Sequence, residues 1–290
     1  MTDMNNIESL VVPKSYIIEQ MNTVCDSGIP DGLRTGVSSL DNLVRLQLGA
    51  FVVITGYSGV GKSEFIDWLC YRYNIKYGYK TLVYSPENSI QQHLPKLISK
   101  FTGKAFNNLV PADRENALWY VCDNFLFIDT NQGKPIEQII SETEKYIIEE
   151  NVKILVFEPY NSFMTQMSDG DVFNLNTIRL ILTKLRDLAV KHNVLVIMSA
   201  HPKKPNDSKP PTAYDIAHSA DFKNRADYNI TIHRNKGAKV QIVVDKVRDK
   251  NFGICDKCNL LYDMDSGNYY NSDDYRDSEY IHEAIEFQKL

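Results

Sequence analysis

The sequence has 290 residues, of which 43% are hydrophobic and 24% charged, and its formal net charge is −5. This composition is that of a globular protein long enough to bury one large core. No apolar run approaches the ~20 residues that cross a bilayer, and the first ten residues lack the basic and apolar pattern of a secretion signal. A membrane-spanning protein is therefore excluded, and no membrane partner is expected.

The N-terminal residues 1–31 are predicted to be an arm, with a short helix within "NNIESLVVPKSYIIEQMNTV" despite Pro13. Residues 32–263 are predicted to form a single domain, and residues 264–290 an acidic C-terminal tail. The segment 263–290 carries eight acidic and two basic side chains, so the rest of the chain has a net charge of +1. The acidic balance therefore does not exclude a nucleic-acid partner, because basic clusters in the core can still hold phosphates.

Short apolar runs alternate with longer segments of helical period, such as residues 62–76 and 175–191. Apolar runs separated by helices predict an α/β fold with a mainly parallel central sheet and helices on both faces. The later runs, "YNITIHR", "KVQIVVDKV" and "CNLLYD", follow one another without helices and predict an antiparallel extension at the C-terminal edge. The earlier apolar runs are "AFVVIT", "TLVYS", "FLFID", "KILVFE" and "VLVIMSA".

The segment "GYSGVGKS" joins the first apolar run to the first helical segment. Its glycines allow a tight turn that presents backbone N–H groups to phosphate oxygens, and the following helix points its positive end at the same place. Lys62 is expected to reach the β- and γ-phosphates, and the Ser63 hydroxyl to bind Mg²⁺. The segment therefore predicts a site for ATP or another NTP with Mg²⁺. The expected nucleotide contacts in this segment are Gly56, Ser58, Gly59, Val60, Gly61, Lys62, Ser63 and Glu64.

Two carboxylates follow buried strands and suit the chemistry of this site. Glu158, in "KILVFEPYN", is expected on the Mg²⁺ side, where most such ATPases have Asp; an inactive site is the alternative. Glu87, in "TLVYSPENS", is expected to be the base that orients the attacking water. The structural alternative for Glu87 is a carboxylate that stabilises a helix N-terminus through the helix dipole.

The order of these motifs resembles the RecA-like motor of DnaB-family (superfamily 4) replicative helicases, most of all the phage primase-helicases and Twinkle. "VLVIMSAHPKKP", "HSADFKNRADYNITIHRN" and "VVDKVRDKNFG" complete the match, which covers about residues 35–270. The resemblance implies a RecA-like P-loop NTPase that forms a ring, usually hexameric, and moves 5′ to 3′ on single-stranded DNA.

The resemblance also implies roles for residues beyond the phosphate loop. His201 matches a sensor of the γ-phosphate, and Lys246 and Arg248 match the basic pair given to the neighbour's nucleotide. Arg234 and Tyr262 match groups near the base. The alternation of Lys246 and Arg248 puts both on one face of a strand, and a γ-phosphate transition state needs extra positive charge. A structural histidine and an uninvolved exposed strand are the alternatives.

The DNA-binding segments are expected near residues 164–174 and 202–218. The second segment carries three lysines suited to phosphate contact, although a solvated loop would look the same. In the fourth motif Asn224 stands where the family often has Gln. The candidate DNA-binding residues are Lys203, Lys204, Lys209, Lys223, Asn224 and Arg225.

Partners, location and competing functions follow from the same resemblance. The phage and mitochondrial relatives carry a primase-like domain before the motor, whereas about thirty residues precede it here, so a separate primase or an excised fragment is expected. The five scattered cysteines favour a reduced, intracellular setting, and the resemblance implies the cytoplasm of a bacterial or phage-infected cell. The lone pair Cys255 and Cys258 is better explained as a strand flank than as a zinc site. The alternative functions are an ATPase that loads or remodels protein on DNA, and a weakly active regulatory module.

Overall fold

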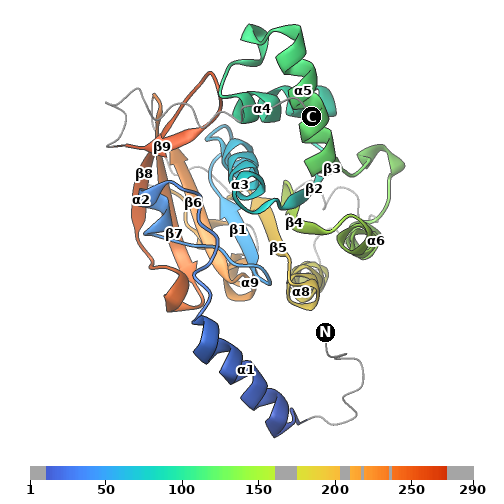
Figure 1. The fold of residues 1–290 in the computed structure, drawn as a ribbon, viewed down its shortest axis with the longest axis vertical. Helices are drawn as coiled ribbons and strands as arrows, with labels where there is room; N and C mark the ends of the chain where they lie inside the picture. Colours follow the sequence, from blue (N-terminus) through green and yellow to red (C-terminus); the bar gives the residue numbers. More distant parts are fainter. Residues whose placement is uncertain (1–10, 161–174, 203–209, 217–218, 235–236, 273–290) are drawn as a thin grey trace. The chain divides into compact units, whose positions relative to one another are not determined.

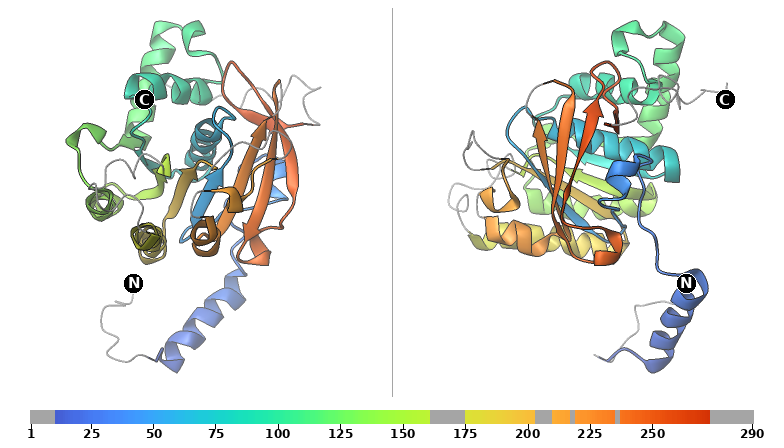
Figure 2. Two further views of the ribbon diagram at one scale, coloured as in Figure 1. Left: turned by 180° about the vertical axis from the view of Figure 1, so that it is seen from behind. Right: turned by 90° about the vertical axis from the view of Figure 1, so that its left-hand side faces the viewer.

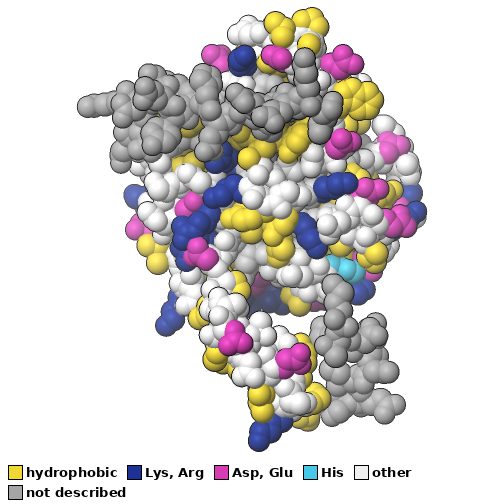
Figure 3. Space-filling model, in the orientation of Figure 1, with side chains coloured by type: hydrophobic (Ala, Val, Ile, Leu, Met, Phe, Trp, Pro, Cys, Tyr) yellow, Lys and Arg dark blue, Asp and Glu magenta, His cyan; other side chains and the backbone are white. Residues whose placement is uncertain are grey.

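The computed structural model describes residues 11–160, 175–202, 210–216, 219–234 and 237–272. The chain divides into two units, residues 1–32 and residues 33–290. The first unit contains helix α1 (Lys14–Ser27), which has no buried residue. Ile17, Ile18 and Met21 on this helix are each about half exposed, and Figure 3 shows apolar side chains along it.

The second unit is built on one nine-stranded sheet, with the order β3-β2-β4-β5-β1-β6-β7-β8-β9. The pairs from β3 to β6 are parallel, and the pairs from β6 to β9 are antiparallel. Figure 1 shows the sheet crossing the middle of this unit. The strands are β1 (Phe51–Thr55), β2 (Lys80–Tyr84), β3 (Phe125–Phe127), β4 (Val152–Phe157), β5 (Leu195–Ala200), β6 (Tyr228–Arg234), β7 (Lys239–Val247), β8 (Lys257–Tyr262) and β9 (Tyr269–Asn271).

Helices cover both faces of the sheet, as the alternation of apolar runs predicts (Figure 2). One core cluster joins the sheet to α3, α4 and α5, and the other joins it to α6, α8 and α9. Strand β1 contributes to both core clusters, because Val52 and Ile54 face the first cluster and Phe51 and Val53 face the second. The helices of this unit are α2 (Ser38–Asp41), α3 (Lys62–Tyr77), α4 (Ile90–Thr102), α5 (Pro111–Asn124), α6 (Ile136–Glu149), α8 (Leu175–His192) and α9 (Ser219–Arg225).

The C-terminal edge is antiparallel as expected, and the structure adds two details. Strand β6 pairs antiparallel with β7, while its other edge pairs in parallel with β1, because helix α9 precedes it and returns the chain to the same end of the sheet. Strand β9 lies within the segment expected as an acidic tail and pairs with β8. The sheet therefore continues past residue 263 as far as Asn271.

Candidate functional site

The phosphate loop joins the carboxyl end of β1 to the N-terminus of α3. A Cβ atom at Gly56 would lie 2.5 Å from the Ile232 carbonyl oxygen of the neighbouring strand β6, so a side chain has no room there. Gly61 caps α3 with φ at 99°, a left-handed conformation that favours glycine. Ser58 and Gly59 are exposed, while Val60 is buried. The loop therefore presents its backbone at the start of a helix, where phosphate oxygens bind.

Lys62 lies buried in the centre of this loop, with 6% of the residue exposed. Its Nζ donates to the carbonyl oxygens of Gly56 (2.9 Å) and Tyr57 (3.1 Å) and lies 3.1 Å from Nδ1 of His201. Burial lowers the pKa of Lys62 to about 8, although Glu158 and Glu87 act in the opposite direction. The ammonium group remains mostly charged at neutral pH and is held where a nucleotide phosphate would replace its present partners.

His201 follows β5 and reaches the loop from the neighbouring strand. Burial and then the charge of Lys62 lower the pKa of His201, and Glu87 partly offsets this. A neutral imidazole whose Nδ1 accepts from Lys62 agrees with these effects. The structure thus places His201 beside Lys62, and the predicted role of His201 as a γ-phosphate sensor requires this position.

Glu158 follows β4 and is only 1% exposed. Its two carboxylate oxygens are buried, and neither accepts a hydrogen bond of ordinary geometry from the described residues. Burial and then the charge of Asp67 raise the pKa of Glu158 to about 7, while His93, the Ser63 hydroxyl and Lys62 lower it. The buried carboxylate and the nearby Ser63 hydroxyl supply the oxygen ligands that Mg²⁺ prefers. The residues present therefore fit a Mg²⁺ ion bound together with nucleotide phosphates.

A buried ion pair lies behind this carboxylate and was not predicted from the sequence. Nε2 of His93, on α4, lies 2.8 Å from Oδ1 of Asp67, on α3, and both side chains are almost fully buried. Burial alone would lower the pKa of His93, but Asp67 and then Glu158 raise it, so that the net shift is upward. The spacing of four residues between Ser63 and Asp67 could have indicated a shared helix face; nothing in the sequence marks His93.

Glu87 stands in the loop that connects β2 to α4, and its side chain is exposed. Its negative charge acts on both Lys62 and His201, which places it within electrostatic reach of the phosphate site. The loop begins with a turn in which the Asn88 side chain donates to the Ser85 hydroxyl at 2.9 Å. The expected orientation of Glu87 toward the nucleotide phosphates and its role as a base both remain predictions.

Aromatic side chains line the other side of the loop, where the base of a nucleotide is expected. The Arg234 guanidinium lies over the Tyr262 ring at 5.2 Å, and Tyr262 contacts Tyr269 with ring centroids 5.0 Å apart. Tyr269 in turn packs against Trp68, and its hydroxyl oxygen lies 3.7 Å from where a Cβ atom on Gly61 would stand. Arg234 and Tyr262 thus contact one another, while their predicted place near the base remains a prediction. Tyr269 was missed because its strand was assigned to the tail.

Glu64 is held beneath these rings by two lysines of α4. Its carboxylate lies 2.5 Å from Nζ of Lys100 and 3.0 Å from Nζ of Lys96. Burial alone would raise the pKa of Glu64, but the two lysines lower it to about 2. Glu64 is therefore a fixed anion in a network with α4, and no direct contact with a nucleotide follows from this geometry.

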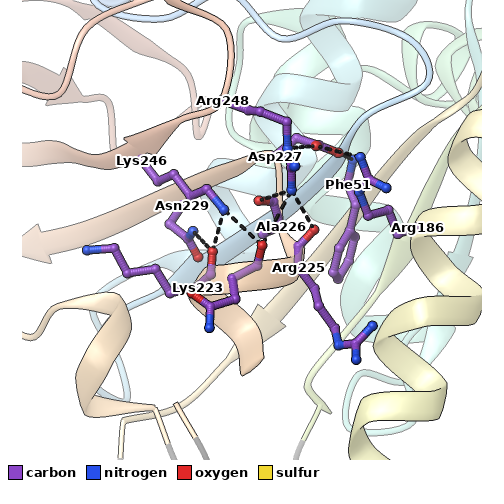
Figure 4. A network of polar contacts seen from close by, with 10 residues as sticks. Phe51, Arg186, Lys223, Arg225, Ala226, Asp227, Asn229, Lys246 and Arg248 are labelled. Atoms are coloured by element: carbon purple, nitrogen blue, oxygen red, sulfur yellow. Dashed lines mark hydrogen bonds and ion pairs between the residues drawn. The ribbon is translucent and has the colours of Figure 1, made fainter. Parts of the chain in front are cut away.

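Lys246 and Arg248 lie together (Figure 4), at the opposite end of strand β1 from the phosphate loop. The Asp227 backbone N–H donates to the Phe51 carbonyl at 2.7 Å, and the Arg248 N–H donates to the Asp227 carbonyl at 2.9 Å. Arg248 is thereby tied to the first residue of β1, whereas the phosphate loop follows its last. The five-residue strand separates the two ends by about 13 Å.

A β-bulge determines which way Lys246 points. The pairing of β6 with β7 shifts register between Asn229 and Ile230, so Asp245 is an extra residue in β7. Val240, Ile242 and Val244 face the core, and simple alternation would have put Lys246 there too. Because of the bulge, Lys246 instead reaches the carbonyl oxygens of Lys223 (2.6 Å) and Asn224 (3.1 Å).

The candidate DNA-binding residues are only partly described. Lys203, Lys204 and Lys209 lie outside the described residues, as does the segment 164–174. Nζ of Lys223 lies 3.9 Å from the centroid of the exposed Tyr214 ring. The side chain of Arg225 donates to the Thr183 hydroxyl. Lys223 therefore places a positive charge over an exposed aromatic ring. Basic and aromatic side chains occur together in this way where single-stranded nucleic acid binds.

The fold and the phosphate site define a P-loop NTPase of the RecA-like class. The family model of the DnaB-like helicase C-terminal domain matches residues 32–271, and the chain belongs to this family. A Twinkle homologue of chloroplasts and mitochondria from Arabidopsis thaliana is 30% identical over 260 residues, which are 83% of this chain and 36% of that protein. The chain therefore spans about a third of the length of this relative.

Two solved structures share the fold at 16% sequence identity. One is that of an ATPase domain, with a TM-score of 0.71 over 91% of this chain and 99% of that chain. The other is a DnaB-like replicative helicase whose interactions with primase were studied, with a TM-score of 0.70 over 91% of this chain and 67% of that chain. No described helix combines the length and apolar character needed to cross a membrane. Cys255 and Cys258 are free thiols.

Proposed function

We propose that this chain is the NTP-driven motor of a replicative DNA helicase, which assembles as a ring and moves 5′ to 3′ on single-stranded DNA. Members of the family are NTP-hydrolysing helicase motors, and the phosphate site described above supports the same activity here. Lys62 would hold the β- and γ-phosphates, and the backbone of Gly56 to Gly61 would bind their oxygens. Arg234 and Tyr262 would enclose the base, with Tyr269 supporting Tyr262 from below.

The hydrolytic step needs a base, a cation and a sensor. Bound Mg²⁺ would neutralise charge on the phosphates, and Ser63 and Glu158 are the residues that would hold it. Glu87 would orient the attacking water and accept its proton. His201, next to Lys62, would detect loss of the γ-phosphate and pass this change to the DNA-binding segment that follows it in the chain.

The observation that carries the ring proposal is the separation of Arg248 from its own phosphate loop. The two groups lie at opposite ends of β1, about 13 Å apart along the strand, so Lys246 and Arg248 would complete a site on a neighbouring copy of the chain. Such a cation supplied by a neighbour stabilises the charge of the phosphoryl-transfer transition state. A homo-oligomeric ring, hexameric in the family expectation, gives every phosphate site a neighbour.

The remaining partners follow from the family resemblance and from exposed side chains. Single-stranded DNA would contact Lys203, Lys204 and Lys209, with Lys223, Asn224 and Arg225 as further candidates. The exposed apolar side chains of α1 would dock on the adjacent subunit. A separate primase is a proposed partner, and a setting in a bacterial or phage-infected cell stays a prediction, because the Arabidopsis relative belongs to chloroplasts and mitochondria.

Mixing two inactive variants tests the shared site. Glu87→Gln keeps the Arg248 cation but loses the base, whereas Arg248→Ala keeps the base but loses the cation. Each variant alone is expected to hydrolyse NTP very slowly, whereas mixed rings should regain activity at interfaces that join an intact base to an intact arginine. If subunit exchange is demonstrated and no activity returns, the shared-site proposal is wrong. Unwinding of a forked DNA then separates a helicase from an ATPase that only loads or remodels protein.

A further inference from the structure

Asp227 is a buried carboxylate at the junction of α9 and β6, with 5% of the residue exposed. Its Oδ2 accepts the backbone N–H of Phe51 at 3.0 Å, and its own N–H donates to the Phe51 carbonyl at 2.7 Å. These two hydrogen bonds fix Asp227 to the first residue of the central strand β1. The side chain is therefore a rigid support rather than a mobile surface acid.

The other carboxylate oxygen of Asp227 receives two guanidinium groups (Figure 4). Nε of Arg248 lies 2.5 Å from Oδ1, and the terminal nitrogen Nη2 of Arg186 lies 3.4 Å from the same oxygen. The Arg248 N–H also donates to the Asp227 carbonyl at 2.9 Å. Arg248 is therefore attached to Asp227 by both its backbone and the inner edge of its side chain.

The outer part of the Arg248 guanidinium is left available. Its Nη2 group lies 3.4–3.5 Å from the carbonyl oxygens of Asn224, Arg225 and Ala226 at the end of α9, which is at the weak limit of a hydrogen bond. Its Nη1 group makes no hydrogen bond to the described residues, and 47% of the side chain is exposed. Arginine carries five N–H donors in a planar fork, so one edge can bind a carboxylate while the other binds a phosphate.

Lys246 is held by backbone carbonyl oxygens. Its Nζ donates to the Lys223 and Asn224 carbonyl oxygens, and burial and then the charge of Arg248 lower its pKa, while Asp227 partly offsets this. Two like charges thus lie side by side, and the buried carboxylate of Asp227 is the anion that makes this arrangement favourable. Removing that charge would leave both cations to repel one another.

We propose that Asp227 is the positioning residue for Arg248, holding the guanidinium by Nε so that its outer edge is presented to the nucleotide of a neighbouring subunit. This inference rests on the proposed shared site. Asp227 does not touch the nucleotide itself and acts only through the arginine. A long side chain at a rim samples many rotamers, and fixing it before the neighbour's nucleotide arrives lowers the entropy lost in the reaction.

The test is Asp227→Asn, which preserves shape but removes the charge. An amide can present its oxygen to the Phe51 N–H or to Arg248, but not to both, so the grip on Nε is lost. We expect the NTPase kcat to fall by about 10²-fold, the loss typical of a group displaced by about 1 Å, while KM for NTP changes by less than about threefold. Arg186→Gln is the matched control: it removes the other cation on the same carboxylate, and its kcat should stay near that of the wild type.

Two readouts separate positioning from a merely structural role. In an Arg248→Ala background, Asp227→Asn should cause no further loss of kcat, because its effect passes through the missing arginine. In mixed rings, Asp227→Asn should regain activity with Glu87→Gln but not with Arg248→Ala. A normal kcat, a full further loss in the double variant, or recovery with Arg248→Ala would each overturn the proposal.

The same experiment distinguishes failure of this inference from failure of the shared site. If mixed rings of Glu87→Gln and Arg248→Ala regain no NTPase activity although subunits exchange, the shared-site proposal is wrong, and Arg248 is not presented to a neighbour. In that case the comparison of the double variant with Arg248→Ala shows only whether Asp227 supports Arg248 inside one subunit. If Asp227→Asn does not fold, Arg248→Lys takes its place. A lysine has no Nε edge for Asp227 to hold, so it should lose as much activity as Arg248→Ala, and retained activity would overturn the proposal.

Discussion

The two ends of strand β1 carry basic groups in contrasting surroundings. At the carboxyl end, Lys62 is buried among backbone carbonyls and lies next to His201, and the carboxylate of Glu158 is buried without a hydrogen-bond donor among the described residues. At the amino end, Arg248 is nearly half exposed and is held by one edge. The first arrangement suits a ligand that enters the chain's own loop. The second suits a ligand that belongs to another molecule.

One of the two largest expected effects comes from Arg248→Ala at the amino end. Arginines supplied to a neighbour's phosphoryl-transfer site contribute ~10³–10⁵ in rate, so turnover should fall by that order while nucleotide binding stays nearly normal. The measurement is steady-state NTPase activity together with titration of a fluorescent nucleotide. Normal hydrolysis by this variant would show that Arg248 at the amino end takes no part in the reaction.

Lys62→Ala should abolish turnover from the carboxyl end, and in addition weaken nucleotide binding, because the loop loses its side-chain cation. The fold should survive, since burial already disfavours this charge, as its pKa of about 8 shows. Nucleotide titration and thermal unfolding of the purified variant check both statements. Turnover equal to that of the wild type would show that phosphate is bound elsewhere.

Glu87→Gln should leave nucleotide binding intact and slow hydrolysis by ~10²–10⁴-fold, the usual contribution of a positioned base. The substitution keeps the size of the side chain and removes its ability to take a proton. A single-turnover measurement with radiolabelled NTP isolates the hydrolytic step. Hydrolysis within about threefold of the wild type would assign the base to another residue.

The salt dependence of DNA binding tests two groups of lysines separately. Lys203, Lys204 and Lys209 follow His201 in the chain, whereas Lys223 lies next to the Lys246 and Arg248 pair. If each of the first three neutralises one phosphate of single-stranded DNA, changing all three to Ala should reduce the log–log slope by roughly 2 units, and Lys223→Ala by about 0.7. Fluorescence anisotropy at several salt concentrations measures both slopes. An unchanged slope for the triple variant would move the DNA contact away from that segment.

The smallest expected effect concerns the buried pair of His93 and Asp67. Asp67 and Glu158 raise the pKa of His93 despite burial and Lys96, so its stabilising contribution is complete below the unfolded pKa of about 6.5 and is lost as pH rises through the folded value. Glu158, whose pKa is also raised, acts in the same direction. The wild type should therefore lose stability between pH 6 and 8, by up to about 1.4 kcal/mol for each unit of the His93 shift.

The control for this pH dependence is His93→Gln, which should unfold with a shallower dependence on pH over the same interval. Thermal unfolding at pH 6, 7 and 8 gives both slopes. Equal slopes for the variant and the wild type would show that His93 does not titrate in this range.

The sequence alone determined the fold class and the order of the functional groups. Runs such as "AFVVIT" and "VLVIMSA" are apolar throughout because parallel strands are covered on both faces, and the spacing of "GYSGVGKS" is set by local backbone requirements. These features depend on neighbours in the chain and can be interpreted without tertiary contacts. For the same reason the phosphate loop and Glu158 could be located from their local sequence, and the family resemblance located the Lys246–Arg248 pair.

Other features depended on contacts between distant residues. The parallel pairing of β6 with β1 and the strand β9 beyond residue 263 are set by pairing across the sheet. The bulge at Asp245 turns Lys246 away from the core, where simple alternation along the strand would have put it. The pairing of Asp67 with His93, and the grip of Asp227 on Arg248, join residues 26 and 21 positions apart. Only the packing of strands and helices brings such groups into contact, because hydrogen bonds and ion pairs act over a few ångströms in space regardless of separation along the chain.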